Sequence, residues 1–228
     1  MHIELSSPSA GRFATVTMND GDVFTSEVGA MIAMDTGITV ETTSRQRGSS
    51  GGIMKGIRRM FSGESFFLNH FTAHGNDQRL MLGPKLVGDI AAHTLNGNSL
   101  IVQGFSWMGS SAGISVDTTW AGFSNALFSG EGIFCVNCSG TGDVLMNAFG
   151  AIYSIEVDGE YVVDTGHIVA FEDTLSFKPA KAADSWLSSI FGGEGLVSHF
   201  SGKGKIYCQT HNPSNFGRAV GPKLKPRD

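Results

Sequence analysis

Short alternations of apolar and polar residues, interrupted by glycine, run along most of the chain and predict strands. The clearest example spans residues 153–164, where YSIEV and EYVVD flank Asp158-Gly159. Alternation with period two and an enrichment in β-branched residues are typical of strands that bury one face. Because an Asp-Gly dipeptide supplies the positive φ angles of a type I′ turn, the pattern predicts a β-hairpin here.

The same turn signal occurs twice more, at Asp20-Gly21 and Asn96-Gly97, and a further strand-like run follows each one. Ile38-Thr-Val-Glu and Ile114-Ser-Val-Asp begin 17 residues after the turn glycine, and Leu175-Ser-Phe-Lys begins 16 residues after it. Signals that recur in one order at nearly one spacing indicate an internal repeat.

A Phe-x-Gly-Glu motif follows each of these runs. It stands at 61–64, 128–131 and 191–194, with separations of 67 and 63 residues. A short helix-like segment precedes each copy (GIRRMF, FSNALF and SWLSSIF), and two strand-like runs follow it. We therefore expect each unit to contain a hairpin, a further strand, a short helix, a tight turn and two closing strands.

These patterns place three units at residues 1–76, 77–142 and 143–210. Units of this size that consist of short strands predict small β-sandwiches or double-stranded β-helix-like shapes. The predicted fold is therefore mainly β, with three tandem pseudo-threefold units, a few short helices and one compact domain. The polar tail, 211–228, contains three prolines and is expected to be mobile.

Composition places the chain among soluble globular proteins. It has 228 residues, a net charge of −5 and 41% hydrophobic residues, enough to form a packed core. No apolar run reaches the roughly 18 residues of a spanning helix, and the first residues lack a basic-then-apolar signal. Three cysteines are too few for a disulfide framework, so we expect a cytoplasmic protein.

Charge is distributed unevenly. Residues 44–60 insert into the first unit and carry five positive charges without an acidic residue; the tail carries +3, which leaves −13 on the rest. The basic residues of the insert are Arg45, Arg47, Lys55, Arg58 and Arg59. They are candidates for contact with the phosphates of a lipid surface or of RNA. Because the body is acidic, we expect no nucleic-acid partner, and we favour a solvated connection that packs on the body over a peripheral membrane contact.

Several motifs resemble a known family. They are Glu27-Val-Gly-Ala-Met31, the three Phe-x-Gly-Glu turns, and Gly140-Thr-Gly-Asp-Val144 with Asn147-Ala-Phe-Gly150. Together they resemble the mitochondrial biogenesis family named for altered inheritance of mitochondria, over nearly the whole chain. The resemblance implies three tandem units, each similar to a subunit of the tryptophan RNA-binding attenuation protein. It implies little about chemistry.

The cysteines have a spacing that zinc sites use. Cys135-Val-Asn-Cys138 and Cys208-Gln-Thr-His211 together would supply four ligands. The repeat, however, aligns Cys138 with Phe71 and Phe200, which favours a small core residue. Since residues three apart in a strand point to opposite faces, we interpret these cysteines as structural and expect no metal or cofactor.

Two other patterns suggest chemistry only superficially. Gly109-Ser-Ser111-Ala-Gly113 fits the G-x-S-x-G of a nucleophile elbow, but a strand-like run follows it where that motif requires a helix. His70 and His199 share a repeat position at which the second unit has Asn137, so a symmetric histidine site is not expected.

Glu64, Glu131 and Glu194 occupy one repeat position. Three carboxylates near a pseudo-threefold axis are candidates for binding a cation. We favour a structural role beside tight turns, in which each accepts backbone hydrogen bonds.

The sequence therefore predicts a non-catalytic β-rich binding or assembly module that forms homo-oligomers, with a protein partner as a further expectation. Trp107, Trp120 and Trp186 would serve either as contact surfaces or as buried packing. One alternative is an enzyme or small-ligand protein with a pocket between units. Another is a binder of anionic lipid or RNA that acts through residues 44–60.

Overall fold

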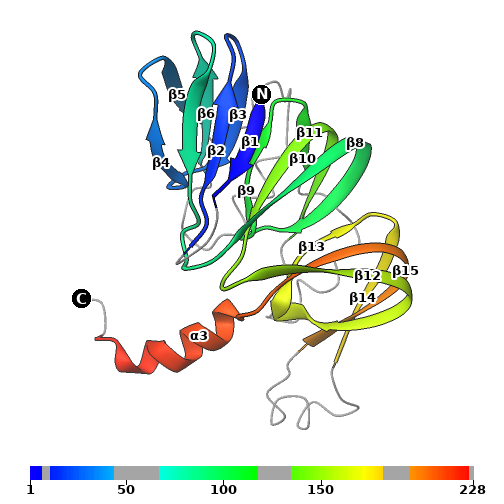
Figure 1. The fold of residues 1–228 in the computed structure, drawn as a ribbon. Coiled ribbons are helices and arrows are strands. Elements are labelled where there is room, and N and C mark those ends of the chain that lie inside the picture. The colour runs from blue at the N-terminus through cyan, green and yellow to red at the C-terminus, as the bar shows by residue number, and fades with distance from the viewer. Residues whose placement is uncertain (7–10, 44–66, 118–134, 182–195, 226–228) are drawn as a thin grey trace.

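The computed structural model describes residues 1–6, 11–43, 67–117, 135–181 and 196–225. Most of them lie in strands, which confirms the prediction of a mainly β fold. Figure 1 shows the strands as three groups that fan out from one end of the molecule, formed by residues 2–82, 90–147 and 152–209. No α-helix in this described part of the chain is long and apolar enough to cross a membrane.

The first group divides between two sheets. Its strands are β1 (His2–Leu5), β2 (Ala14–Met18), β3 (Val23–Glu27), β4 (Met31–Met34), β5 (Ile38–Thr43), β6 (Leu68–Ala73) and β7 (Gln78–Leu82). A four-stranded sheet has the order β1-β2-β7-β4, whereas β3, β6 and β5 lie at one end of a larger sheet. All of these pairings are antiparallel.

The second group is built on two long strands. Its members are β8 (Ile90–Gln103), β9 (Trp107–Ser111), β10 (Ile114–Asp117) and β11 (Cys135–Asn147). β8 and β11 pair antiparallel along nearly their whole length. The shorter β9 and β10 pair with different halves of β11.

The third group follows the same order of pairing. It contains β12 (Ile152–Asp164), β13 (Ile168–Glu172), β14 (Leu175–Lys181) and β15 (Leu196–Gln209). β12 and β15 pair from Ile152↔Gln209 to Asp164↔Val197, while β13 and β14 pair with different halves of β15. One eleven-stranded sheet joins all three groups through the pairs β13·β8 and β9·β3.

The predicted type I′ hairpins are wrong. Asp158-Gly159 lies inside β12, where Gly159 faces Gly202, and Asn96-Gly97 lies inside β8. Asp20-Gly21 does form a turn, in which the N–H of Asp22 donates to the carbonyl of Asn19 at 2.9 Å, but this turn leads from one sheet to the other. Pairing along the full length of the partner strand outweighs the local turn preference, so the positive-φ glycines bend long strands instead of reversing them.

Other sequence predictions meet the structure directly. The runs that begin at Ile38, Ile114 and Leu175 form β5, β10 and β14, as predicted. β11 runs unbroken across the expected unit boundary between residues 142 and 143. The helix-like segments and the Phe-x-Gly-Glu turns lie outside the described residues.

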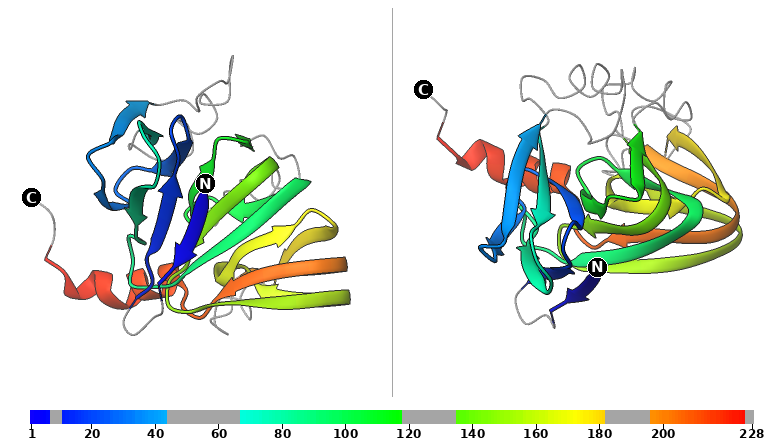
Figure 2. Two further views of the ribbon diagram at one scale, coloured as in Figure 1. Left: turned by 45° about the horizontal axis from the view of Figure 1, so that its top comes forward. Right: turned by 90° about the horizontal axis from the view of Figure 1, so that it is seen from above.

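The tail that was expected to be mobile contains helix α3 (Pro213–Val220), followed by a 3₁₀ turn at Gly221–Lys223. The side chain of Asn212 caps α3 by accepting from the N–H groups of Ser214 and Asn215, at 2.9 and 3.3 Å. An Asn cap followed by proline at the first helical position is a favourable helix start. Figure 2 shows α3 extending away from the strands.

Three clusters of buried side chains form the core, and each belongs mainly to one group of strands. Phe71, Cys138 and Phe200, which the predicted repeat aligns, are all buried, one in each cluster. Trp107 is buried in the cluster that belongs to the second group of strands, so for this residue the interpretation as buried packing is correct.

Candidate functional site

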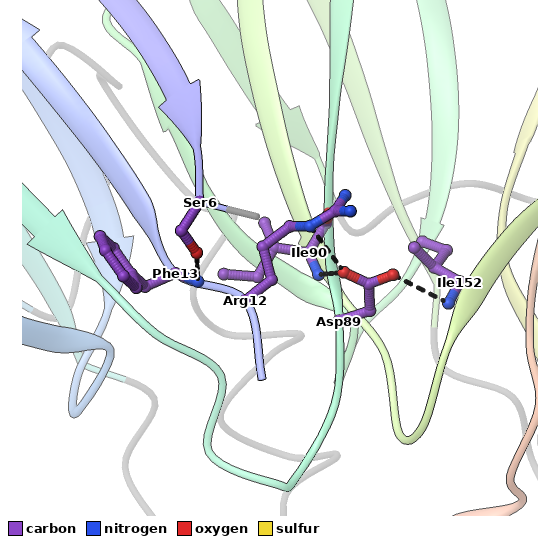
Figure 3. Close-up of polar contacts among 6 residues, drawn as sticks. All are labelled: Ser6, Arg12, Phe13, Asp89, Ile90 and Ile152. Carbon is purple, nitrogen blue, oxygen red and sulfur yellow. Dashed lines mark hydrogen bonds and ion pairs between the residues drawn. The ribbon is translucent and has the colours of Figure 1, made fainter. Parts of the chain in front are cut away.

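An ion pair between Arg12 and Asp89 lies near the starts of β2, β8 and β12, one strand from each group (Figure 3). Nε of Arg12, just before β2, lies 3.1 Å from Oδ1 of Asp89, just before β8. The other carboxylate oxygen accepts from the N–H of Ile152, the first residue of β12, at 3.4 Å. Arg12 also donates from Nη1 to the carbonyl of Ile90 at 3.3 Å. One carboxylate therefore links the starts of all three groups.

The backbone is tightly packed beside this ion pair. Gly88 and Gly150 form a parallel bridge, and the N–H of Gly150 donates to the carbonyl of Val87 at 3.1 Å. A Cβ atom at Gly88 would stand 1.7 Å from the carbonyl oxygen of Ala148. Only glycine fits at that position, because no backbone can approach a side chain so closely.

A second polar contact joins the first and second groups. Glu27, at the end of β3, is buried and accepts from Nζ of Lys85 at 2.6 Å and from Nδ2 of Asn147 at 3.5 Å. Burial raises the pKa of Glu27 above its ordinary value, and the hydrogen bond and charge of Lys85 oppose that rise. Glu27 thus links a loop of the first group to the end of β11.

A third polar contact joins the second and third groups. Nδ1 of His93 on β8 shares a hydrogen bond of 2.9 Å with the hydroxyl of Tyr207 on β15. Nε2 of the same ring is buried and has no hydrogen-bond partner among the described residues. Burial lowers the pKa of His93, while the charge of nearby Glu172 acts in the opposite direction. His93 therefore links the second and third groups through one ring nitrogen only, among the described residues.

The three cysteines are buried thiols. Cys135 and Cys138 belong to different core clusters, as expected for residues three apart in a strand. Burial raises the pKa of Cys135 and raises the pKa values of Cys138 and Cys208 to about 12 and about 11. Thiols with such pKa values are poor nucleophiles and poor metal ligands at neutral pH. Within the described residues, no group of three His, Cys, Asp or Glu side chains is arranged to hold a metal ion.

The G-x-S-x-G segment connects two strands. Ser111 ends β9 and β10 begins at Ile114, so this segment lacks the helix that a nucleophile elbow needs. The hydroxyl oxygen of Ser111 accepts from the N–H of Asp143 at 2.9 Å. Ser111 therefore has a structural contact in place of the base that would activate it.

The two aligned histidines lie in different surroundings. His70 is buried on β6, and its ring nitrogens share hydrogen bonds with the hydroxyls of Thr25 and Thr43 at 2.8 and 2.9 Å. His199 is exposed on β15. The structure places the two histidines apart, and the sequence analysis had not predicted a site that combines them.

The other predicted site residues lie outside the described part of the chain. They are the basic residues Arg45, Arg47, Lys55, Arg58 and Arg59, the carboxylates Glu64, Glu131 and Glu194, and Trp120 and Trp186. Their predicted roles in anion contact, turn stabilisation and packing stay predictions.

β4 is an exposed apolar strand. Every residue of β4 is exposed, and the exposed fractions of Met31, Ile32 and Met34 are 42%, 57% and 37%. β7 is its only strand partner within the described residues, so β4 is the last strand of its sheet there. Exposed apolar edges of this kind are typical of sites where a further strand pairs.

Sequence reasoning missed the side chains at the joints between groups. Asp89, Lys85 and His93 stand in no recognisable motif, and their partners are 58 or more residues away in the chain. The only local signal is the glycine before Asp89, which does not specify a partner. β4 was also missed, since no strand was predicted over Met31–Met34.

Comparisons with known proteins agree with this architecture. The model of the family described as "Mitochondrial biogenesis AIM24" matches residues 4–211. An uncharacterised protein of Streptococcus pyogenes serotype M6 is 30% identical over 192 residues, which cover 82% of this chain and 77% of that protein. A crystal structure of a protein from Streptococcus pyogenes superimposes with a TM-score of 0.79 at 25% identity, covering 98% of this chain and 99% of that one.

Proposed function

The chain belongs to the mitochondrial biogenesis AIM24 family, and we propose that it is a non-catalytic β-rich module that assembles with copies of itself or with another protein. The observation that carries the proposal is the strand β4, which combines three large exposed apolar side chains with an edge that pairs with none of the described strands. Methionine side chains adapt to varied partners, which suits a contact surface.

We also propose that the three groups of strands are copies of one plan. Each group contains two antiparallel long paths: β2–β3 and β6–β7 in the first group, β8 and β11 in the second, and β12 and β15 in the third. Each path contains a glycine with positive φ near its middle. These glycines are Gly21 and Gly75, Gly97 and Gly140, and Gly159 and Gly202. The short strands β4, β9 and β13 each pair with the last part of their group with one register shift, at Met31/Ala33, Leu145/Met146 and Ile168/Ala170. The natural unit boundaries then fall near residues 88 and 150, before β8 and before β12.

A repeated side-chain contact supports this plan. At or just after the end of each short strand, a side chain accepts a hydrogen bond from a backbone N–H of the neighbouring strand. The three contacts are Asp35 from Arg79 at 2.9 Å, Ser111 from Asp143 at 2.9 Å, and Glu172 from Lys205 at 3.0 Å. Three different residue types make the same contact. The plan also agrees with the likeness to a subunit of the tryptophan RNA-binding attenuation protein, which stays part of the proposal.

Sedimentation equilibrium over micromolar concentrations tests the assembly proposal. The unmodified protein should self-associate, and Ile32→Lys should weaken that association because it places a charge on the apolar surface of β4. Val87→Lys is a matched control, since Val87 is 79% exposed and lies outside the strands. A protein that stays monomeric throughout would contradict self-assembly.

A second candidate, a small-ligand site between the second and third groups, is favoured by one observation. Nε2 of His93 is buried without a hydrogen-bond partner among the described residues, beside Tyr207 and close to the charge of Glu172. Crystals grown from a native preparation would test this candidate, with electron density for a bound molecule at Nε2 expected. The alternative of an anionic-surface binder rests on residues 44–60, outside the described part of the chain.

A further inference from the structure

The three groups of strands join one another through one repeated pairing. Between the second and first groups, β9 pairs with β3 as Ser111↔Phe24, Ser110↔Thr25 and Gly109↔Ser26. Between the third and second groups, β13 pairs with β8 as Glu172↔Leu100, Phe171↔Ile101 and Ala170↔Val102. The second and third groups therefore each use their second strand, β9 or β13, to pair with a strand of the group before them, β3 or β8.

The two pairings have the same register. In β3 the paired residues lie three to five positions after the bend glycine Gly21, and in β8 they lie three to five positions after Gly97. The partner strands β9 and β13 end at Ser111 and Glu172. In each strand this last residue is the one whose side chain accepts the repeated backbone hydrogen bond. The joint is thus a defined three-residue interface.

Among the described strands, two halves of this interface are unused. β4 occupies the place of β9 and β13 in the first group, but β7 is its only partner in the described part of the chain. The end of β12 occupies the place of β3 and the end of β8 in the third group, but of the described strands β12 pairs with β15 alone. Both are therefore sheet edges, and they are the two halves of the joint that repeats inside the molecule.

Their side chains agree with an unfilled contact. β9 and β13 are almost entirely buried, whereas β4 is exposed along its whole length. On β12, Tyr161 and Val162 are 45% and 51% exposed. In Figure 1, β4 and β12 lie at opposite ends of the fan of strands, so neither can reach the other within one chain.

We propose that β4 of one copy pairs antiparallel with the end of β12 of a second copy, in the register Asp35↔Val162, Met34↔Val163 and Ala33↔Asp164. This inference rests on the assembly proposal above and names the partner of β4. The contact is head to tail, since it joins two different surfaces, and it leaves the β12 edge of the first copy and the β4 edge of the second copy free. Repetition of the contact therefore builds a ring when the rotation closes and a filament when it does not.

Disulfide trapping tests the register. A copy carrying Asp35→Cys is mixed with a copy carrying Val162→Cys, at a position that is 51% exposed in the unmodified chain, and intermolecular cross-linking is measured on non-reducing gels. Residues directly opposite in an antiparallel pair bring their Cβ atoms within disulfide range. The three native cysteines are buried, which keeps background cross-linking low.

The matched control shifts one position. Met34→Cys mixed with Val162→Cys places the two thiols on opposite faces of the sheet, because successive side chains alternate. The expected result is strong cross-linking of the 35–162 pair and little of the 34–162 pair. Equal cross-linking of both pairs would overturn the proposed register.

A substitution on the other edge keeps the proposal falsifiable if a cysteine variant fails to fold. Val162→Lys should raise the dissociation constant of self-association by at least about tenfold, as Ile32→Lys does, since a lysine on an edge strand discourages pairing. If Ile32→Lys breaks the assembly and Val162→Lys leaves it intact, the pairing with β12 is wrong and the assembly function stands. If the unmodified protein never associates, both proposals fail.

Discussion

In the third group of strands, β12 and β15 stay paired without interruption through Asp158↔Lys203 and Gly159↔Gly202. In the first group, pairing of the equivalent paths stops at Met18↔Gln78 and resumes at Val23↔Thr72. The second group is intermediate, with one register shift between Ser139 and Thr141. All three bends contain glycines at positive φ, so the difference lies in the residues that remain unpaired around them.

This difference decides what the first group exposes. Residues 19–22 and 74–77, which lie outside the strands, separate β2 and β7 from β3 and β6, and β2 and β7 belong to the four-stranded sheet. β4 belongs to that sheet and is exposed, whereas β9 and β13 lie within the large sheet and are buried. Where strand pairing continues through the bend, the group stays in one sheet. Where pairing is interrupted at the bend, as in the first group, part of the group forms a separate sheet.

The largest effect is expected from the aromatic core positions that the two outer groups share. Phe71→Ala and Phe200→Ala should each lower the free energy of unfolding by about 3–5 kcal/mol, because both rings are fully buried. Cys138→Ala, at the aligned position of the second group, should cost only about 1 kcal/mol, since a much smaller group is removed. Urea denaturation measures all three. A cost for Cys138→Ala equal to that of the phenylalanines would contradict the alignment.

The bends themselves provide the next contrast. Gly140→Ala combines a φ of +126° with a Cβ that would stand 2.2 Å from the carbonyl oxygen of Gly113. It should cost more than the roughly 1–2 kcal/mol of a positive φ alone. Gly21→Ala, in the broken bend, has φ +80° with no atom within 4 Å, so only the conformational cost is expected. Thermal unfolding of the two variants would refute this contrast if their melting temperatures fell equally.

A smaller effect is expected where the three groups meet. Asp89→Asn keeps the size of the side chain but removes the charge that faces Arg12, so stability should fall by about 1–3 kcal/mol. Glu4→Gln serves as a control, because Glu4 is exposed and the substitution makes the same change of charge. Unfolding in guanidinium would then show a lower midpoint for Asp89→Asn alone.

The smallest effect concerns the joint of the second and third groups, and it depends on pH. Because burial lowers the pKa of His93, the unfolded chain binds more protons than the folded one below the ordinary pKa of 6.5. Stability should therefore fall as pH decreases from 6.5 toward the lowered pKa.

His93→Asn replaces the imidazole with an amide that can still hydrogen-bond to Tyr207 but does not titrate. The difference in unfolding free energy between the unmodified protein and this variant should be constant above pH 7 and should shift against the unmodified protein on acidification. A difference that does not change with pH would contradict a buried neutral His93.

Local patterns predicted the strands well and their connections poorly. The alternating runs at Ile38, Ile114 and Leu175 form strands because a half-buried strand needs only its own side-chain pattern. Asp158-Gly159 was misassigned as a hairpin because the same backbone conformation serves a bend when a partner strand continues opposite it. The opposite orientation of Cys135 and Cys138 followed correctly from strand geometry.

The sequence by itself determined the mainly β fold and the burial of Phe71, Cys138 and Phe200, since each depends on side-chain pattern and spacing. Only the tertiary structure decided that Asp89 links three groups, that His93 contacts Tyr207, and that β4 and β12 are sheet edges among the described strands. The reason is physical: these features arise from contacts between segments far apart in the chain, and a local pattern does not specify which distant segment lies opposite.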